Sequence, residues 1–133
     1  MWSLGCILAE LCLGKPIFPG ENEPEQMLMF MEVLGVPPPS LIQQGSRSHK
    51  YFDGGMVKVK PNSKGKLRRP NTKSLDAILG SCGDEDFINF VRKFLVWSPE
   101  ERMTPNEAMT DRWVLKGLPE QVKRQHLSLA YKT

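Results

Sequence analysis

The stretch from Trp2 to Leu13 is apolar on every side of the helix that it would form, through Leu4, Ile7, Leu8, Leu11 and Leu13. A helix that is apolar all round belongs in the middle of a core, so we expect other segments to pack around it. At about 13 residues, with Glu10 inside, the stretch is shorter than the ~20 residues of a membrane span, and it lacks the charged start of a secretory signal. No capping residue precedes it, which indicates that the sequence begins within a domain. Gly14 is suited to end the helix.

A second helix is predicted to follow a proline-containing loop. Asn22 can cap it, with Pro24 in its first turn and Glu25 at the position of a capping-box acid. Gly35 closes the pattern, and the prolines at 37–39 prevent its continuation. The apolar face of this helix consists of Met27, Leu28, Phe30, Met31 and Leu34.

The stretch 40–75 is poor in apolar residues and strongly basic. Between positions 45 and 73 it has nine Lys or Arg residues and one acid, Asp53, whereas the rest of the chain has nine basic and fourteen acidic residues. The net charge of +3 is therefore local to one insertion, which we interpret as a solvated surface loop. Residues 56–59 alternate at period two, which allows short β-strands. A nucleic-acid contact through 58–69 is a weaker alternative, because only Tyr51 and Phe52 could stack on bases.

Helical patterning resumes at Asp84 and continues to Trp97, with the acids at 84–86 offsetting the helix dipole. Thr104 and Glu107 form a capping-box pattern with proline between them, which predicts a short helix from Pro105 to about Trp113. The remainder, 119–133, is polar and weakly patterned, and we expect a tail there.

No residue pattern in the chain indicates a self-contained active site. With 40% hydrophobic and 25% charged residues, the 133 residues suit one globular domain. Phosphate-binding glycine motifs and a GxSxG elbow are absent, so we predict no catalytic and no cofactor-binding residue. His49 and His126 stand far apart and the cysteines at 6, 12 and 82 form no CxxC pair, so we predict no metal ligand. The odd, sparse cysteine count favours a reducing compartment over a disulfide scaffold.

Several motifs together resemble one family. The sequence from Trp2 to Leu11 resembles the long central helix of the C-lobe in eukaryotic protein kinases, and the stretches 14–20, 99–105 and 108–113 continue the likeness in the same order. More closely, Phe18-Pro-Gly-Glu-Asn-Glu, Met31-Glu-Val-Leu-Gly, Gly65-Lys-Leu-Arg and Phe94-Leu-Val-Trp resemble the dual-specificity tyrosine-regulated (DYRK) kinases of the CMGC group.

The resemblance implies a mostly α-helical fold, the lower half of a kinase C-lobe with an irregular basic insertion. It assigns 1–118 to a partial kinase domain, 40–75 to the CMGC-type insertion and 119–133 to a polar tail. Asp111-Arg112-Trp113 departs from the usual His-Pro-Trp.

The function implied is that of a protein kinase, which phosphorylates Ser, Thr or Tyr with ATP and Mg²⁺. The glycine-rich loop, the ATP-pairing lysine and the HRD, DFG and APE motifs of the family precede the segment that this chain resembles. We therefore expect this chain alone to bind neither ATP nor Mg²⁺ and to have no kinase activity. The alternative is a catalytically inactive interaction module. Expected partners are the upstream kinase lobe and a protein substrate or regulatory protein. We expect neither a membrane nor a nucleic acid as a partner. The expected location is inside the cell, in the cytoplasm or nucleus.

Three residues acquire expected roles from the resemblance. Trp2 and Arg102 are structural anchors, and Arg102 matches the arginine that pairs with the glutamate of APE; the alternative is an exposed loop arginine. Glu10 lies near the peptide groove of the family, where such an acid can hold a basic substrate residue. The alternative for Glu10 is a structural glutamate bonded to backbone.

Overall fold

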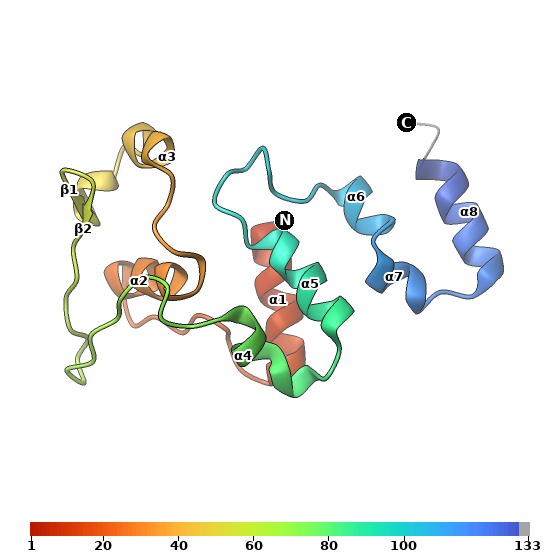
Figure 1. Ribbon diagram of the computed structural model, residues 1–133, viewed down its shortest axis with the longest axis horizontal. Coiled ribbons are helices and arrows are strands. Elements are labelled where there is room, and N and C mark those ends of the chain that lie inside the picture. The colour runs from red at the N-terminus through yellow and green to blue at the C-terminus, as the bar shows by residue number, and fades with distance from the viewer. Residues whose placement is uncertain (131–133) are drawn as a thin grey trace.

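The computed structural model describes residues 1–130 and is mostly helical, which confirms the expected fold class (Figure 1). The two short strands are antiparallel and form a β-hairpin, with Phe52 opposite Val57. The elements in chain order are α1 (Trp2–Leu13), α2 (Glu23–Leu34), α3 (Pro39–Gln44), η1 (Ser48–Lys50), β1 (Phe52–Asp53), β2 (Met56–Val57), α4 (Leu75–Leu79), η2 (Gly80–Cys82), α5 (Glu85–Phe94), α6 (Pro105–Met109), α7 (Arg112–Lys116) and α8 (Glu120–Ala130).

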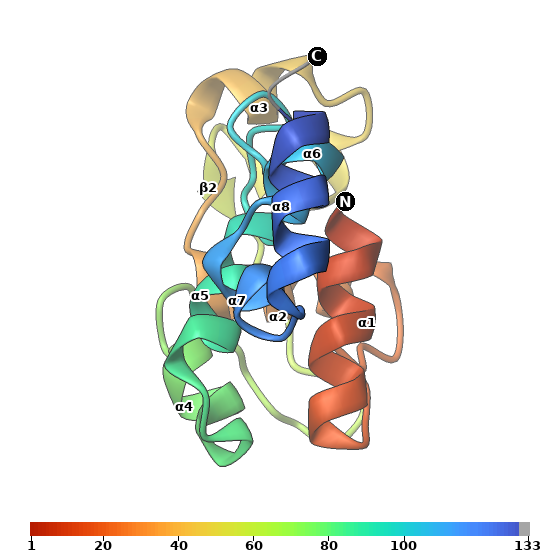
Figure 2. The ribbon, with the colours of Figure 1, turned by 90° about the vertical axis from the view of Figure 1, so that its right-hand side faces the viewer.

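The elements lie in three groups along the long axis. The helices α1, α4 and α5 form the middle group, α2, α3 and the hairpin lie on one side, and α6, α7 and α8 lie on the other (Figures 1 and 2). In the middle, α1 packs against α5 and α4. The apolar residues that meet in this core include Ala9, Leu75, Leu79, Phe87, Ile88, Val91 and Leu95.

One face of α1 remains exposed, so the expectation of burial on all sides is wrong within residues 1–130. Leu4, Ile7 and Leu11 are 43%, 52% and 76% exposed. They recur at helical spacing, because residues three and four apart share one face. The opposite face, with Gly5 and Ala9, is buried.

Gly5 allows α1 and α5 to approach closely. A Cβ at Gly5 would lie 2.5 Å from Cβ of Phe94, a side chain that is fully buried. We expect Gly5→Ala to lower the free energy of unfolding by about 1–3 kcal/mol, because overpacking forces the helices apart. Thermal unfolding followed by circular dichroism measures this. Gly80→Ala is the matched control, since Gly80 has right-handed helical angles and no atom within 4 Å of its Cβ position. Equal melting temperatures for the two variants would contradict the prediction.

The segment after Thr104 differs from its prediction. The expected helix over 105–113 is two helices, because Asp111 caps α7 by accepting the backbone N–H of Trp113 at 2.9 Å. Asp111 is buried and pairs with Lys93 at 2.5 Å, which holds the chain in a non-helical turn there. The expected tail contains α8, which its weak pattern did not predict; residues 131–133 lie outside the described residues.

Two cysteines are joined, contrary to the expectation from their count. Cys12, near the end of α1, and Cys82, in η2, form a disulfide with their Cα atoms 6.1 Å apart. They are 70 positions apart in sequence, so no local spacing indicates the pair, and only the packing of α1 beside η2 brings them together. No helix among residues 1–130 has the length and apolar character needed to cross a membrane.

Candidate functional site

Trp2 and Glu10, two of the residues singled out from the sequence, line the same hollow beside α1. Its volume is about 320 Å³, and α1, the loop after it and α2 contribute its walls. Its lining is mainly apolar and consists of Trp2, Ser3, Cys6, Ile7, Glu10, Pro16, Ile17, Phe18, Gln26 and Phe30. Burial raises the pKa of the Cys6 thiol, so this side chain favours its neutral form.

Glu10 is exposed at this hollow, although the helix that carries it is otherwise apolar. Within residues 1–130 its carboxylate forms no hydrogen bond and no ion pair; its backbone carbonyl accepts the N–H of Gly14 at 2.8 Å. The carboxylate is therefore free to meet a charged group beside an apolar surface.

Trp2 belongs to a cluster of aromatic rings that joins α1, α2 and the segment after α5. Its ring centroid lies 5.2 Å from that of Phe30 and 5.8 Å from that of Trp97, and Phe30 also contacts Phe18 at 5.0 Å. The indole N–H of Trp97 donates to the carbonyl of Gly35 at 3.1 Å. Aromatic pairs at these distances add about 0.5–1.5 kcal/mol each beyond their buried area.

Arg102 is half-buried and contacts the Trp2 ring of this cluster. Its Nε donates to the carbonyl of Val96 at 3.0 Å and its Nη2 donates to the carbonyl of Trp97 at 3.2 Å. The guanidinium carbon lies 5.3 Å from the centroid of the Trp2 ring, within cation–π range. Arg102 is therefore neither fully buried without a partner nor freely exposed. Trp2 and Arg102 are neighbours, and Glu10 shares the hollow with Trp2.

A buried charged network, which the sequence analysis missed, fastens the basic insertion to α2. Arg68 donates through Nε to Glu25 Oε1 and through Nη1 to Glu32 Oε2, both at 2.9 Å, and Lys73 Nζ lies 3.1 Å from Glu32 Oε2. The side chains of Arg68, Glu25 and Glu32 are 9%, 7% and 5% exposed. Most of 45–73 is exposed, as expected of a surface loop, but the buried Arg68 anchors part of it to α2. The one sequence feature that could have indicated this network is the pair of acids Glu25 and Glu32, which lie seven positions apart on α2.

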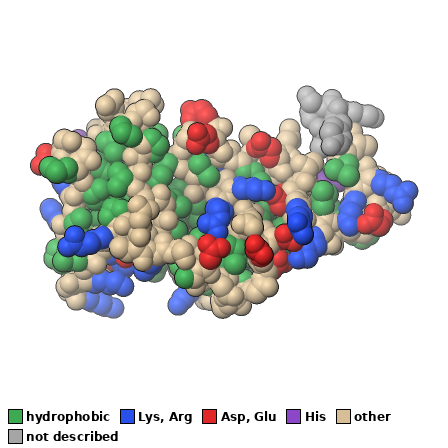
Figure 3. All heavy atoms as spheres, viewed as in Figure 1, with side chains coloured by type: hydrophobic (Ala, Val, Ile, Leu, Met, Phe, Trp, Pro, Cys, Tyr) green, Lys and Arg blue, Asp and Glu red, His purple; other side chains and the backbone are tan. Residues whose placement is uncertain are grey.

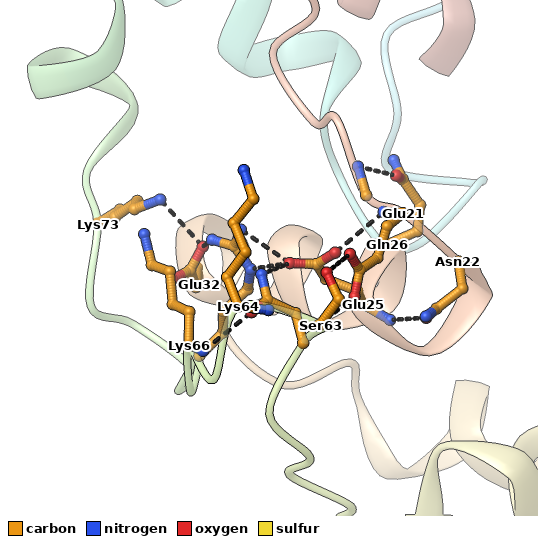
Figure 4. A network of polar contacts seen from close by, with 12 residues as sticks. Glu21, Asn22, Glu25, Gln26, Glu32, Ser63, Lys64, Lys66 and Lys73 are labelled. Carbon is orange, nitrogen blue, oxygen red and sulfur yellow. Dashed lines mark hydrogen bonds and ion pairs between the residues drawn. The ribbon is translucent and has the colours of Figure 1, made fainter.

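Further side-chain and backbone contacts extend this anchor in both directions (Figure 4). The side chain of Asn62 donates to Glu25 Oε1 at 2.8 Å, and the hydroxyl of Ser63 donates to Glu21 Oε2 at 2.5 Å. At the other end of α2, the N–H of Lys73 donates to the carbonyl of Glu32 at 3.0 Å. The segment 62–73 therefore follows the whole length of α2.

The network controls the charge of Glu25. Hydrogen bonds from the backbone N–H of Glu21, then from Asn62 and from Arg68, lower the pKa of the Glu25 carboxyl to about 2. Burial alone would lower the pKa of Arg68, but the bonds and charges of Glu25 and Glu32 outweigh it and raise that pKa.

This pKa predicts a specific acid sensitivity. An unfolded glutamate has a pKa of about 4.3, so the stabilisation from ionised Glu25 is fully present above that value and is lost as the pH falls towards 2. Glu25→Gln should be less stable than the natural protein near neutral pH, and the difference should shrink between about pH 4.5 and 2. Melting temperatures from pH 7 to 2 measure it. Glu101→Gln is the control: Glu101 is exposed and has no side-chain bond among residues 1–130. A constant difference across this range would contradict the prediction.

No group of three or more His, Cys, Asp or Glu side chains in the described part of the chain could hold a metal ion. The acids at 84–86 lie at the N-terminus of α5, where negative charge offsets the helix dipole, as predicted. Asp84 Oδ1 accepts hydrogen bonds from the backbone N–H groups of Asp86 and Phe87.

Comparison with known proteins identifies the family. Residues 1–114 match the protein kinase domain family. Human dual specificity tyrosine-phosphorylation-regulated kinase 4 is 50% identical over 115 residues, 86% of this chain and 22% of that protein. Drosophila melanogaster dual specificity tyrosine-phosphorylation-regulated kinase 2 is 53% identical over 109 residues, 81% of this chain and 15% of that protein. The DYRK-family kinase pom1 of Schizosaccharomyces pombe is 49% identical over 109 residues, 81% of this chain and 10% of that protein.

The chain thus spans less than a quarter of the length of these relatives. The match covers α1 to α6 and the start of α7, including the aromatic cluster, Arg102 and the anchored insertion. The chain belongs to the protein kinase family and corresponds to part of a DYRK-like kinase domain.

Proposed function

We propose that this chain is the part of a protein kinase that helps to hold the protein substrate, within an enzyme that phosphorylates Ser, Thr or Tyr with ATP. The observation that carries the proposal is Glu10, a carboxylate without a partner among residues 1–130, exposed beside an apolar hollow. The names of the relatives, dual specificity kinases, support the same class of activity.

The hollow suits a basic side chain of an extended peptide. Arginine and lysine have aliphatic stems that favour apolar surfaces and charged ends that favour carboxylates. The stem would contact the apolar lining around Trp2, and the charge would meet Glu10. Arg102 does not line this hollow; it contacts the ring of Trp2.

ATP and Mg²⁺ belong, in this proposal, to residues outside this chain. No cluster among residues 1–130 suits a metal ion, and the motifs that bind the nucleotide in the family precede the matched segment, so we derive no step through either group. When bound, they supply and neutralise the phosphoryl group that is transferred.

Calorimetry with Mg-ATP tests this division of roles. The full-length protein should bind Mg-ATP and phosphorylate peptides, whereas residues 1–133 alone should give no saturable heat below millimolar nucleotide. Binding by the isolated chain would contradict the division. Full-length protein that neither binds Mg-ATP nor transfers phosphate would instead favour the inactive interaction module.

We also propose that the protein resides in the cytoplasm or nucleus. The odd cysteine count supports this location, and the Cys12–Cys82 disulfide counts against it, because disulfides are rare in reducing compartments. Alkylation of free thiols in intact cells, followed by mass spectrometry, measures how many of the three cysteines are reduced. Three reduced cysteines would support this location, and a single reduced cysteine would count against it.

A further inference from the structure

A large hollow lies beside α3 and the β1–β2 hairpin, partly within the basic insertion. Its volume is about 1140 Å³, slightly above the usual range for ligand pockets. The loop after α2, α3, η1 and the β1–β2 hairpin enclose it, and we call it the insertion groove. Its apolar lining includes Val36, Pro37, Pro38, Ile42, Phe52 and Met56.

The apolar wall of the groove is exposed to an unusual degree. Val36 is 42% exposed and Met56 is 71% exposed, and no residue of α3 is buried. In Figure 3, hydrophobic side chains gather over the region of α3 and the hairpin, and Lys and Arg side chains lie at its edges. Contiguous apolar surface with a polar rim is typical of an interaction site.

The walls are formed before anything binds. Consecutive prolines at 37–39 fix the backbone of one wall. In the other, Gly54 and Gly55 have φ of 52° and 87°, the left-handed angles that a tight hairpin turn requires. Lys58 lies beyond this turn, where its N–H donates to the carbonyl of Tyr51 at 2.8 Å and its Nζ donates to the carbonyl of His49 at 2.7 Å. A preformed groove loses less entropy on binding.

The charge at one end of the groove is positive. Lys58 lines both the groove and a small adjoining pocket that Lys50 and Lys60 also line. None of these three lysines forms an ion pair within residues 1–130, and the groove holds one acid, Asp53. Neighbouring positive charges favour an acidic occupant.

We propose that the insertion groove binds a short acidic segment of a partner protein, with one or more apolar side chains in the groove and carboxylates on the lysines. Nucleic acid fits less well, because Phe52 is only 7% exposed and the rest of the apolar lining is aliphatic. A second copy fits less well too, because its matching patch would carry the same positive charge. The proposal does not depend on Glu10 or on kinase activity.

Random 12-residue peptides displayed on phage and selected on the full-length protein test the proposal. The enriched peptides should combine Asp or Glu with large apolar residues. Measured by fluorescence anisotropy, their binding should weaken at least about tenfold with Met56→Asp, and it should weaken with Lys60→Glu and with added salt. Met56→Leu should keep the affinity. Met109→Asp and Lys15→Glu are the matched controls, since both residues are exposed and lie outside the groove.

Several results would overturn the proposal. One is a selection that enriches no peptide; another is a set of peptides that bind the Met56→Asp and Lys60→Glu variants as tightly as the natural protein. A 15-residue polyuridine that binds with dependence on Lys60 but not on Met56 would assign the surface to RNA. A dimer in gel filtration that Met56→Asp dissociates would assign it to a second copy. Melting temperatures establish that each variant is folded.

Discussion

Arg68→Ala is expected to lower the free energy of unfolding by about 3–5 kcal/mol, because it leaves the buried carboxylate of Glu25 without a countercharge and leaves that of Glu32 with Lys73 alone. Arg68 contacts Glu25 and Glu32, both at 2.9 Å, and all three side chains are less than a tenth exposed. Removing one member of such a network costs more than the network contributes as a whole, because the remaining charges cannot regain their hydration.

Urea unfolding followed by circular dichroism at pH 7 measures this effect. Arg69→Ala is the control: Arg69 is the next residue, is exposed, and forms no side-chain bond among residues 1–130, so its replacement should change stability by less than about 0.5 kcal/mol. The penalty of Arg68→Ala should shrink below about pH 4, where carboxyl groups take up protons. Equal effects of the two alanine variants would show that the network contributes nothing.

Glu10→Gln in the full-length kinase is expected to weaken the preference for a peptide with an upstream arginine by about ten- to a hundredfold. A charge-assisted hydrogen bond is worth about 1.5–3 kcal/mol, and glutamine keeps the shape of the side chain while removing its charge. Activity on the matched peptide with alanine should change little, because that peptide has no charged side chain to pair with the carboxylate.

The ratio of kcat/KM on the two peptides measures the preference. Glu101→Gln, at an exposed glutamate that does not line the hollow, should leave the ratio unchanged. An unchanged ratio for Glu10→Gln, with a lower melting temperature, would make Glu10 a structural residue and remove the observation that carries the proposed function.

Local signals predicted the ends of helices well. Asn22 caps α2 by accepting the N–H of Glu25 at 3.0 Å, and Thr104 and Glu107 form the predicted capping box of α6. Gly14 ends α1 in a left-handed conformation, with φ of 70°. These features involve residues within four positions of one another, so a single sequence contains everything that determines them.

Contacts between distant segments were not predictable in this way. Glu25 accepts from Glu21 rather than closing a capping box, because Asn62 and Arg68 approach it from the insertion. Which face of α1 is exposed was not predictable either, because apolar composition indicates which residues favour burial but not which partners are available to cover them.

Arg68 and Arg69 illustrate the limit most directly. The sequence by itself determined a basic stretch between two helices, since charge and helical periodicity are properties of the residues alone. It gave these two neighbours the same charge and the same interpretation. Only the tertiary structure decided that the side chain of Arg68 is 9% exposed between Glu25 and Glu32 while Arg69 faces solvent. The physical reason is that an extended chain points successive side chains in opposite directions, and the packing of this segment along α2 selects which of them is buried.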